Sequence, residues 1–280
     1  MDEAAAVCRA RLGGDLSLRI ESILSSDHRA LLAWFARSNV LLAFDYDGTL
    51  APIASTPESA KMRHSTRVLL ARTARLYPCV IISGRSLDDL TRRLRHIPAW
   101  YLFGNHGLEP PPPGRASTPT PAHGWAIHLK KRLPHDTGLM IEDKRYSLTI
   151  HYRNVRDKRA AIDAINQAVS ELPDARALAG AEAVSLLPRG GGDKGVALQQ
   201  ACRWFACGSA IYVGDDATDE DAFTSRYPEK LLTIRVGHAE ESRASYHLDR
   251  QEDIDALLGI LVELRNGESA TSRRRGMAVR

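Results

Sequence analysis

The chain has few of the sequence features that are typical of membrane-spanning, zinc-binding and nucleic-acid-binding proteins. Its 280 residues include only four cysteines, Cys8, Cys79, Cys202 and Cys207, without a Cys-x-x-Cys pair or a zinc-like Cys/His spacing. No apolar run is long enough to cross a bilayer. Aromatic residues make up 6% and the formal net charge is +4, so a basic stripe with interleaved aromatics is missing. We therefore expect no membrane or nucleic-acid partner.

The remaining composition is that of an ordinary globular protein with reduced thiols. Hydrophobic residues make up 44% and charged residues 26%, which is ample for a large core or for two domains. The N-terminal sequence MDEAAAVCRARLGG lacks the apolar centre of a signal peptide, and we expect a cytoplasmic location. No long coiled-coil seam is visible, so a monomer is the default expectation.

Short apolar runs alternate with helical patterns along much of the chain. Residues 16–37 have helical spacing, and 40–44, 79–83 and 99–107 are apolar runs separated by amphipathic segments. The same alternation resumes after residue 190 and ends in a helical pattern at 254–267. Strand-helix alternation with strands apolar on both faces predicts the α/β class, with a doubly wound, Rossmann-like parallel sheet.

A different pattern interrupts this alternation. The proline-rich stretch GLEPPPPGRASTPTPAHG excludes a regular helix or central strand, and RYSLTIHYR then alternates as a half-buried strand does. The sequence predicts an α+β domain at 109–189, inserted into a core formed by 38–108 and 190–265. We expect an N-terminal helical segment at 1–37 and a basic, disordered tail at 266–280.

Polar motifs follow several predicted strands. They are Asp45-Tyr-Asp47-Gly-Thr, Ser83-Gly84-Arg85, the GDKG turn with Lys194, and the acidic turn that begins at Gly214. Ligands of open α/β sheets bind at the carboxyl ends of the strands, where these motifs should meet. Carboxylates, a hydroxyl and an ammonium suit a divalent cation together with a phosphate group.

Each motif alone has a plainer interpretation. The Asp-x-Asp-Gly run is typical of a solvated turn, and Ser83 is a good N-cap for the helix that follows it. GDKG lacks the spacing of a P-loop, and GDDATDED is favourable as an acidic helix N-terminus. The occurrence of all four motifs, in this order along the chain, is informative about function.

In combination, these motifs resemble the haloacid dehalogenase (HAD) superfamily of phosphatases over about residues 30–265. Within it, the chain is similar to trehalose-6-phosphate phosphatases, on the segments FDYDGTLAPI, SGR, GNHGLE, IEDKRYSLTIHYR, PRGGGDKG and YVGDDATDEDAF. The resemblance implies a HAD-like core with an inserted cap that carries substrate specificity. It also implies Mg²⁺-dependent hydrolysis of trehalose 6-phosphate, as in trehalose biosynthesis, through an aspartyl-phosphate.

The resemblance assigns a role to each core motif. Asp45 would be the nucleophile and Asp47 the general acid and base. Mg²⁺ would be held by the carboxylates of Asp45 and Asp215 and by the backbone carbonyl of Asp47. Ser83 and Lys194 would bind the transferring phosphate. The sequence leaves open whether Asp216 and Asp219 bind the metal directly, through water, or only support its ligands.

A second group of residues is expected to contact the sugar. Glu142 and Lys144 lie two apart at the entry to a predicted strand and so share a face, where a carboxylate and an ammonium suit sugar hydroxyls. Without the resemblance, they would be a plain surface ion pair. His151 and Arg153 are expected at a domain contact or a binding surface. The candidate substrate-binding residues are Gly84, Arg85, Asn105, His106, Glu142 and Lys144.

One position departs from the family pattern. Ser185 stands where these phosphatases usually have a glutamate that contacts the sugar, and Glu182 is three residues away in the wrong register. Alternatives therefore remain: a phosphatase for another glycosyl phosphate, such as glucosylglycerol phosphate or sucrose phosphate, or a catalytically silent sugar-phosphate sensor. Linkers near Glu109 and Pro188 predict that the cap closes over the substrate.

Overall fold

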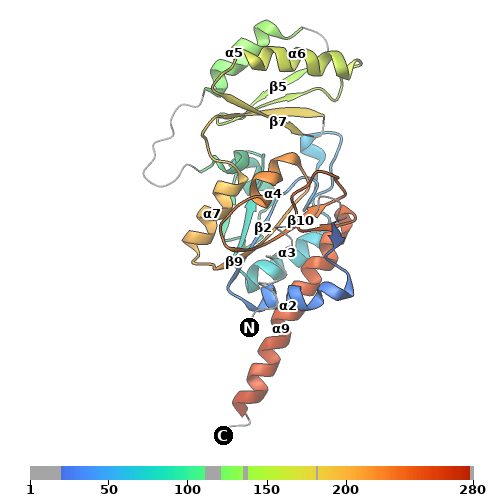
Figure 1. Cartoon of the computed structure of the whole chain (residues 1–280), viewed down its shortest axis with the longest axis vertical. Coiled ribbons are helices and arrows are strands. Elements are labelled where there is room, and N and C mark those ends of the chain that lie inside the picture. Colours follow the sequence, from blue (N-terminus) through green and yellow to red (C-terminus); the bar gives the residue numbers. More distant parts are fainter. Residues whose placement is uncertain (1–19, 111–120, 135–137, 181, 278–280) are drawn as a thin grey trace.

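The larger of two β-sheets forms the centre of the protein (Figure 1). The computed structural model describes residues 20–110, 121–134, 138–180 and 182–277. All neighbouring strands of this seven-stranded sheet are parallel, in the order β1-β11-β10-β9-β2-β3-β4. The strands are β1 (Glu21–Ser22), β2 (Val40–Phe44), β3 (Cys79–Ile82), β4 (Tyr101–Phe103), β9 (Ser209–Gly214), β10 (Lys230–Val236) and β11 (Tyr246–Leu248). The predicted parallel sheet is confirmed.

Helices cover both faces of this sheet. One face packs against α2 (Arg29–Arg37), α3 (His64–Leu76), α4 (Leu87–Arg93) and α9 (Ile254–Met277). The other packs against α7 (Lys194–Trp204) and α8 (Glu220–Phe223). Every residue of β2 and β9 is buried, because central parallel strands are covered on both sides. Short 3₁₀ helices are η2 (Ser26–His28), η3 (Pro57–Ser59), η4 (Asn105–Gly107), η5 (Ala217–Asp219) and η6 (Gln251–Asp253).

The second sheet is antiparallel and belongs to the inserted segment, called the cap below. Its order is β5-β6-β8-β7, with β5 (Met140–Asp143), β6 (Leu148–His151), β8 (Ala183–Pro188) and β7 (Ala175–Gly180). Helices α5 (Ala122–Arg132) and α6 (Lys158–Ser170) pack on one face through Leu148, Ile150 and their neighbours. The other face is turned toward the larger sheet (Figure 1). Residues that alternate with Leu148 and Ile150 therefore point toward the core.

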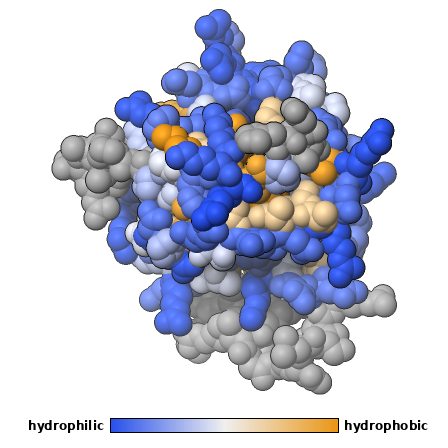
Figure 2. Space-filling view, turned by 90° about the horizontal axis from the view of Figure 1, so that it is seen from above, coloured by the Kyte–Doolittle hydropathy of each residue, from blue (hydrophilic) through white to orange (hydrophobic). Residues whose placement is uncertain are grey.

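The outer surface of the cap is mostly hydrophilic. Seen from above, charged and polar side chains surround a small apolar area (Figure 2). Among the residues that the structure describes, no helix combines the length and the apolar character that a membrane crossing needs.

Two terminal predictions were wrong where the structure describes them. Residues 20–28, expected in a helix over 16–37, form β1 and η2, and α2 begins only at Arg29; residues 1–19 lie outside the described ranges. β1 pairs with β11, and Ser25, Ser26 and Asp27 favour turns by competing for backbone hydrogen bonds. At the other end, α9 runs to Met277 where a disordered tail was expected from 266. Its Glu, Ala, Arg and Met residues are good helix formers.

Besides β1, three strands were not predicted. β7 is an Ala- and Gly-rich segment, residue types that are depleted in strands. β5 and β11 are only four and three residues long. All three depend on pairing with neighbouring strands, which a local pattern does not reveal.

Candidate active site

Two aspartates meet at the carboxyl ends of the central strands β2 and β9. Asp45 follows β2, and its N–H donates to Val213 O (2.9 Å); Asp215 follows β9. The loop after Asp45 folds onto Asp215, whose Oδ1 accepts from Thr49 Oγ1 (3.2 Å). A methyl group at Gly48, which has φ +78°, would lie 2.0 Å from Asp215 Oδ2. Glycine is required here by both its backbone conformation and the close carboxylate.

Lys194 brings a positive charge to the same place. It is the first residue of α7, whose N-cap Asp193 accepts from Val196 N (2.8 Å). Its side chain is 2% exposed, and Nζ donates to Asp45 Oδ1 (3.0 Å) and to Asp219 Oδ1 (2.7 Å). A buried ammonium is tolerated only with such partners.

Asp219 has both carboxylate oxygens occupied by donors. Oδ1 accepts from Lys194 Nζ and from Tyr212 OH (2.6 Å), and Oδ2 accepts from the N–H groups of Asp215 (3.0 Å) and Asp216 (2.9 Å). The side chain is fully buried. Asp219 therefore holds Lys194 and the acidic turn in position, and its lone pairs are already used.

The acidic group needs more positive charge than Lys194 provides. Oxygens of Asp45, Asp215 and Asp219 lie within 4.8 Å of one another. Burial raises the pKa of both Asp45 and Asp215, and neighbouring carboxylates add to the rise while Lys194 opposes it. A divalent cation with oxygen ligands would relieve this repulsion. Because Asp219 is saturated, Asp45 and Asp215 are the carboxylates that fit such an ion.

The end of β3 supplies the next part of the site. Ser83 is buried beside β2, and its Oγ accepts from Arg85 N (3.3 Å). The His106 ring lies against Gly84, where an added methyl group would be 2.6 Å from His106 Cε1. Burial lowers the pKa of His106 well below its ordinary value, helped by the charges of Lys194, Lys144 and Arg176. His106 is therefore a neutral imidazole next to the Ser-Gly-Arg loop at pH 7.

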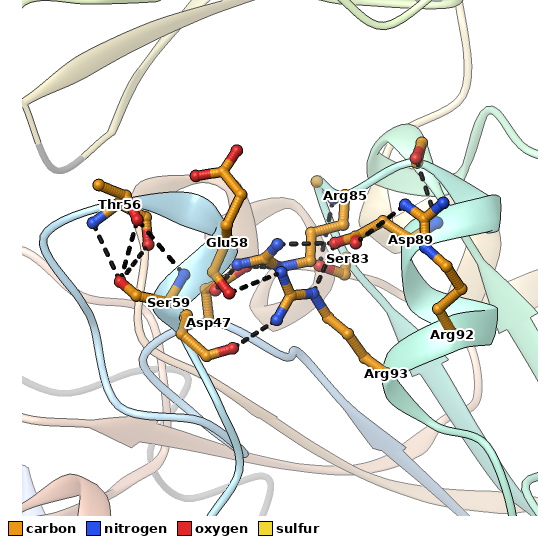
Figure 3. A network of polar contacts seen from close by, with 12 residues as sticks. Asp47, Thr56, Glu58, Ser59, Ser83, Arg85, Asp89, Arg92 and Arg93 are labelled. Atoms are coloured by element: carbon orange, nitrogen blue, oxygen red, sulfur yellow. Dashed lines mark hydrogen bonds and ion pairs between the residues drawn. The ribbon is translucent and has the colours of Figure 1, made fainter.

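Arg85 binds Asp47 through two hydrogen bonds (Figure 3). Arg85 Nε and Nη2 donate to the two oxygens of Asp47, both at 2.6 Å, while Nη1 donates to Asp89 Oδ2 (2.7 Å). Arg93 Nε donates to the same Asp89 oxygen (2.6 Å). This guanidinium orients Asp47, whose side chain remains 39% exposed, and the substrate contact expected of Arg85 stays a prediction.

Cap residues reach into the core site. Lys144 Nζ donates to Gly84 O (3.2 Å) and lies 3.7 Å from Glu142 Oε2. His151 Nε2 lies 2.9 Å from the same Glu142 oxygen. Burial opposes ionisation of Glu142, but the His151 contact and the Lys144 charge outweigh it and lower its pKa. The predicted Glu142–Lys144 pair thus faces the Ser-Gly-Arg loop, with a direct contact between cap and core.

Asn105 joins the two parts of the protein. Its Nδ2 donates to Glu109 Oε2 (2.6 Å) and Lys144 O (3.2 Å), and its Oδ1 accepts from Ser147 Oγ (2.6 Å). The amide is therefore engaged by protein groups, and the substrate contact expected of Asn105 stays a prediction.

Two arginines join the cap to the core away from the Ser-Gly-Arg loop. Arg176, on the unpredicted strand β7, donates to Asp221 Oδ1 (2.6 Å). No sequence motif identifies Arg176 as a residue that contacts the core. Arg153 Nη1 donates to the carbonyls of Ala54 (2.5 Å) and Ser55 (3.0 Å). The alternation of apolar and polar residues over 145–153 led us to expect Arg153 at a domain contact or a binding surface, and it forms a contact between cap and core.

The chain is similar in sequence to known proteins over most of its length. The sequence model of the trehalose-phosphatase family matches residues 43–252. The trehalose-phosphate phosphatase of Mycobacterium marinum is 34% identical over 212 residues, which cover 71% of this chain and 54% of that protein. The chain thus spans about half the length of that relative.

Solved structures show the same fold at low identity. The C-terminal domain of a trehalose-6-phosphate phosphatase from C. albicans has a TM-score of 0.72 at 20% identity, covering 88% of this chain and 99% of that one. A subclass IIB sugar phosphatase of the HAD superfamily has a TM-score of 0.56 at 13% identity, covering 79% and 97%. The fold is therefore HAD-like, and the match over 43–252 shows that this chain belongs to the trehalose-phosphatase family.

Proposed function

We propose that the protein is a Mg²⁺-dependent phosphatase that hydrolyses trehalose 6-phosphate to trehalose and phosphate. The observation that carries this proposal is the buried Asp45–Lys194 contact beside Asp215. A carboxylate nucleophile, an ammonium and a cation site at one strand end are the groups that phosphoryl transfer requires. The name of the M. marinum relative supports the sugar.

The carboxylates of Asp45 and Asp215 and the backbone carbonyl of Asp47 would hold Mg²⁺. When bound, the ion would offset the negative charge of the phosphate and of the two carboxylates. Asp219 keeps the acidic turn and Lys194 in place through its four hydrogen bonds. Asp216 has a separate role as the N-cap of η5, where its carboxylate accepts from Ala217 N.

The chain's own residues would carry out two displacements at phosphorus. An oxygen of Asp45 forms a bond to phosphorus, and the bond from phosphorus to the sugar oxygen breaks while Asp47 gives that oxygen a proton. Asp47 then takes a proton from water, which attacks the aspartyl-phosphate and releases Asp45. Lys194 and Ser83 bind the phosphate oxygens, and Arg85 fixes the direction of Asp47.

Residues 109–189 would act as the cap that selects the sugar. Glu142 and Lys144 present an acceptor and a donor above the Ser-Gly-Arg loop, and neutral His106 is placed to share hydroxyl contacts. A site that hydrogen-bonds hydroxyls discriminates against analogues that lack them. The cap contacts exclude water from the reaction when closed.

Ser185 favours a second candidate, a phosphatase for a different glycosyl phosphate. Ser185 is opposite Thr149 in the cap sheet, and Thr149 is opposite Glu142, so the three share the core-facing surface. The Ser185 and Thr149 hydroxyls lie 3.3 Å apart. A hydroxyl pair where relatives usually have a carboxylate would change how the distant part of the sugar is recognised.

A substrate panel tests these candidates. Phosphate release would be measured with Mg²⁺ on trehalose 6-phosphate, glucose 6-phosphate, sucrose 6-phosphate and glucosylglycerol phosphate, with an EDTA control. We expect trehalose 6-phosphate to give the highest kcat/KM and EDTA to abolish release. Preference for another sugar would assign the change at Ser185 to specificity, and no release from any sugar would favour a silent sensor.

A further inference from the structure

A second group of metal-ligating side chains lies away from Asp45, at the carboxyl ends of β10 and β11 in the larger sheet. His238, His247 and Asp249 bring two imidazoles and a carboxylate together, with one ligand atom from each lying within 4.8 Å of the others. We propose that this His-His-Asp cluster binds a transition-metal ion of the Zn²⁺ class. The proposal does not depend on the proposed phosphatase function.

The spacing of the three side chains matches that of metal ligands. Asp249 Oδ1 lies 2.8 Å from His247 Nε2 and 3.5 Å from His238 Nε2. Ligands bound to zinc at about 2.0–2.2 Å in a tetrahedron are about 3.3 Å apart. The two imidazole rings are also close, with centroids 4.4 Å apart. Small side-chain movements would therefore complete the coordination.

The backbone holds the cluster in place. His247 belongs to β11, and Asp249 lies directly after the end of this strand, with its Oδ1 turned to His247 Nε2. Gly237 N donates to Leu248 O (2.8 Å), which fixes the residues just before His238 and Asp249 beside each other. The three ligands thus come from the ends of two paired parallel strands, β10 and β11.

The chemistry of the donors selects the metal. Imidazole nitrogens with one carboxylate suit Zn²⁺ and its neighbours in the first transition series, whereas Mg²⁺ prefers oxygen ligands and keeps its waters. The catalytic acids and this cluster would therefore bind different ions. His247 is mostly buried, but 69% of the His238 side chain and 58% of the Asp249 side chain are exposed. A metal ion and one or more waters can reach the cluster from solvent.

Zinc titration of the full chain tests this site. Isothermal titration calorimetry would use ZnCl₂ with Mg²⁺ in excess to occupy the catalytic acids. We expect one zinc site in the wild type, weakened at least about tenfold in both His238→Ala and Asp249→Asn. These exposed residues belong to none of the hydrophobic cores, so the variants should fold.

A matched control separates a metal site from a histidine-carboxylate contact. His123 is 82% exposed and lies 3.3 Å from Asp143, and that contact is not part of any metal-ligand group found among the described residues. His123→Ala should leave zinc binding unchanged. If the wild type binds no zinc under these conditions, or if His238→Ala and Asp249→Asn bind it as well as the wild type does, the proposal is wrong. The cluster would then be an ion pair only.

A spectroscopic measurement gives an independent result. Co²⁺ in a nitrogen- and oxygen-ligated site of low coordination number absorbs visible light more strongly than hydrated Co²⁺. We expect this absorption in the wild type and in His123→Ala, and its loss in Asp249→Asn. Equal spectra for the wild type and Asp249→Asn would overturn the proposal even if zinc binds elsewhere.

Discussion

Replacing Asp219 by asparagine should destabilise the protein more than any surface change of the same type. Asn keeps the shape of the side chain but removes the charge that faces Lys194 Nζ at 2.7 Å. It also places an amide NH₂ among four donors, from Lys194, Tyr212, Asp215 and Asp216. Removing one partner of a buried ion pair costs about 3–5 kcal/mol. Since Lys194 keeps Asp45 as a partner, we expect a loss of about 3 kcal/mol.

Urea unfolding followed by circular dichroism measures this loss. Tyr212→Phe removes only one of the four donors and should cost about 1.5–3 kcal/mol, the range for a hydrogen bond to a charged group. Asp163→Asn, an exposed change on α6, should stay within about 0.5 kcal/mol of the wild type. A loss below about 1 kcal/mol for Asp219→Asn would refute the view that this carboxylate holds the buried charges together.

Three further predictions concern the catalytic loop, a buried histidine and the cap. Gly48→Ala places a methyl group against Asp215 at φ +78°, and this variant should lose about 1–3 kcal/mol of stability and most phosphate release. Gly237→Ala, at φ +77° in open space, should keep its activity. Equal activity in both variants would contradict the argument. Burial lowers the pKa of His106, so below about pH 6.5 the unfolded chain protonates this imidazole and the folded protein does not. The free energy of unfolding therefore decreases as the pH is lowered below about 6.5. Between pH 6.5 and 5.5, His106→Gln should lose about 1 kcal/mol less than the wild type in urea unfolding, and parallel losses would mean that His106 is not buried neutral. Arg153→Ala removes the hydrogen bonds to Ala54 and Ser55 and should increase the radius of gyration in solution scattering. Arg159→Ala, an exposed change nearby, should leave the radius unchanged. An unchanged radius in both variants would contradict cap docking through Arg153.

The central sheet and its polar ends could be predicted because the signals are local. β2, β3 and β9 are continuous apolar runs, and each is followed at once by a polar motif. Parallel strands place the motifs after β2, β3 and β9 at one edge, so the meeting of Asp45 and Asp215 follows from topology, whereas Lys194 comes from the start of α7. The Glu142–Lys144 pair followed in the same way from its two-residue spacing.

Hydrogen-bond partners could not be predicted because they depend on segments far apart in the chain. Asp219 looked like one acid among several, and only packing shows that Tyr212 and Lys194 both donate to it. The motif that marks Arg85 does not reveal that its guanidinium contacts Asp47. The His238–His247–Asp249 cluster has no recognisable spacing in sequence, since a strand ladder brings its members together.

The most direct test of the central claim is phosphate release from trehalose 6-phosphate by Asp45→Asn. The variant removes the proposed nucleophile and keeps its shape, and Asp88→Asn, an exposed change on α4, serves as the control. Circular dichroism would show that both variants fold. With saturating Mg²⁺, we predict that Asp45→Asn loses at least about a thousandfold in kcat while Asp88→Asn matches the wild type. Near-normal turnover by folded Asp45→Asn would contradict catalysis through an aspartyl-phosphate at this residue.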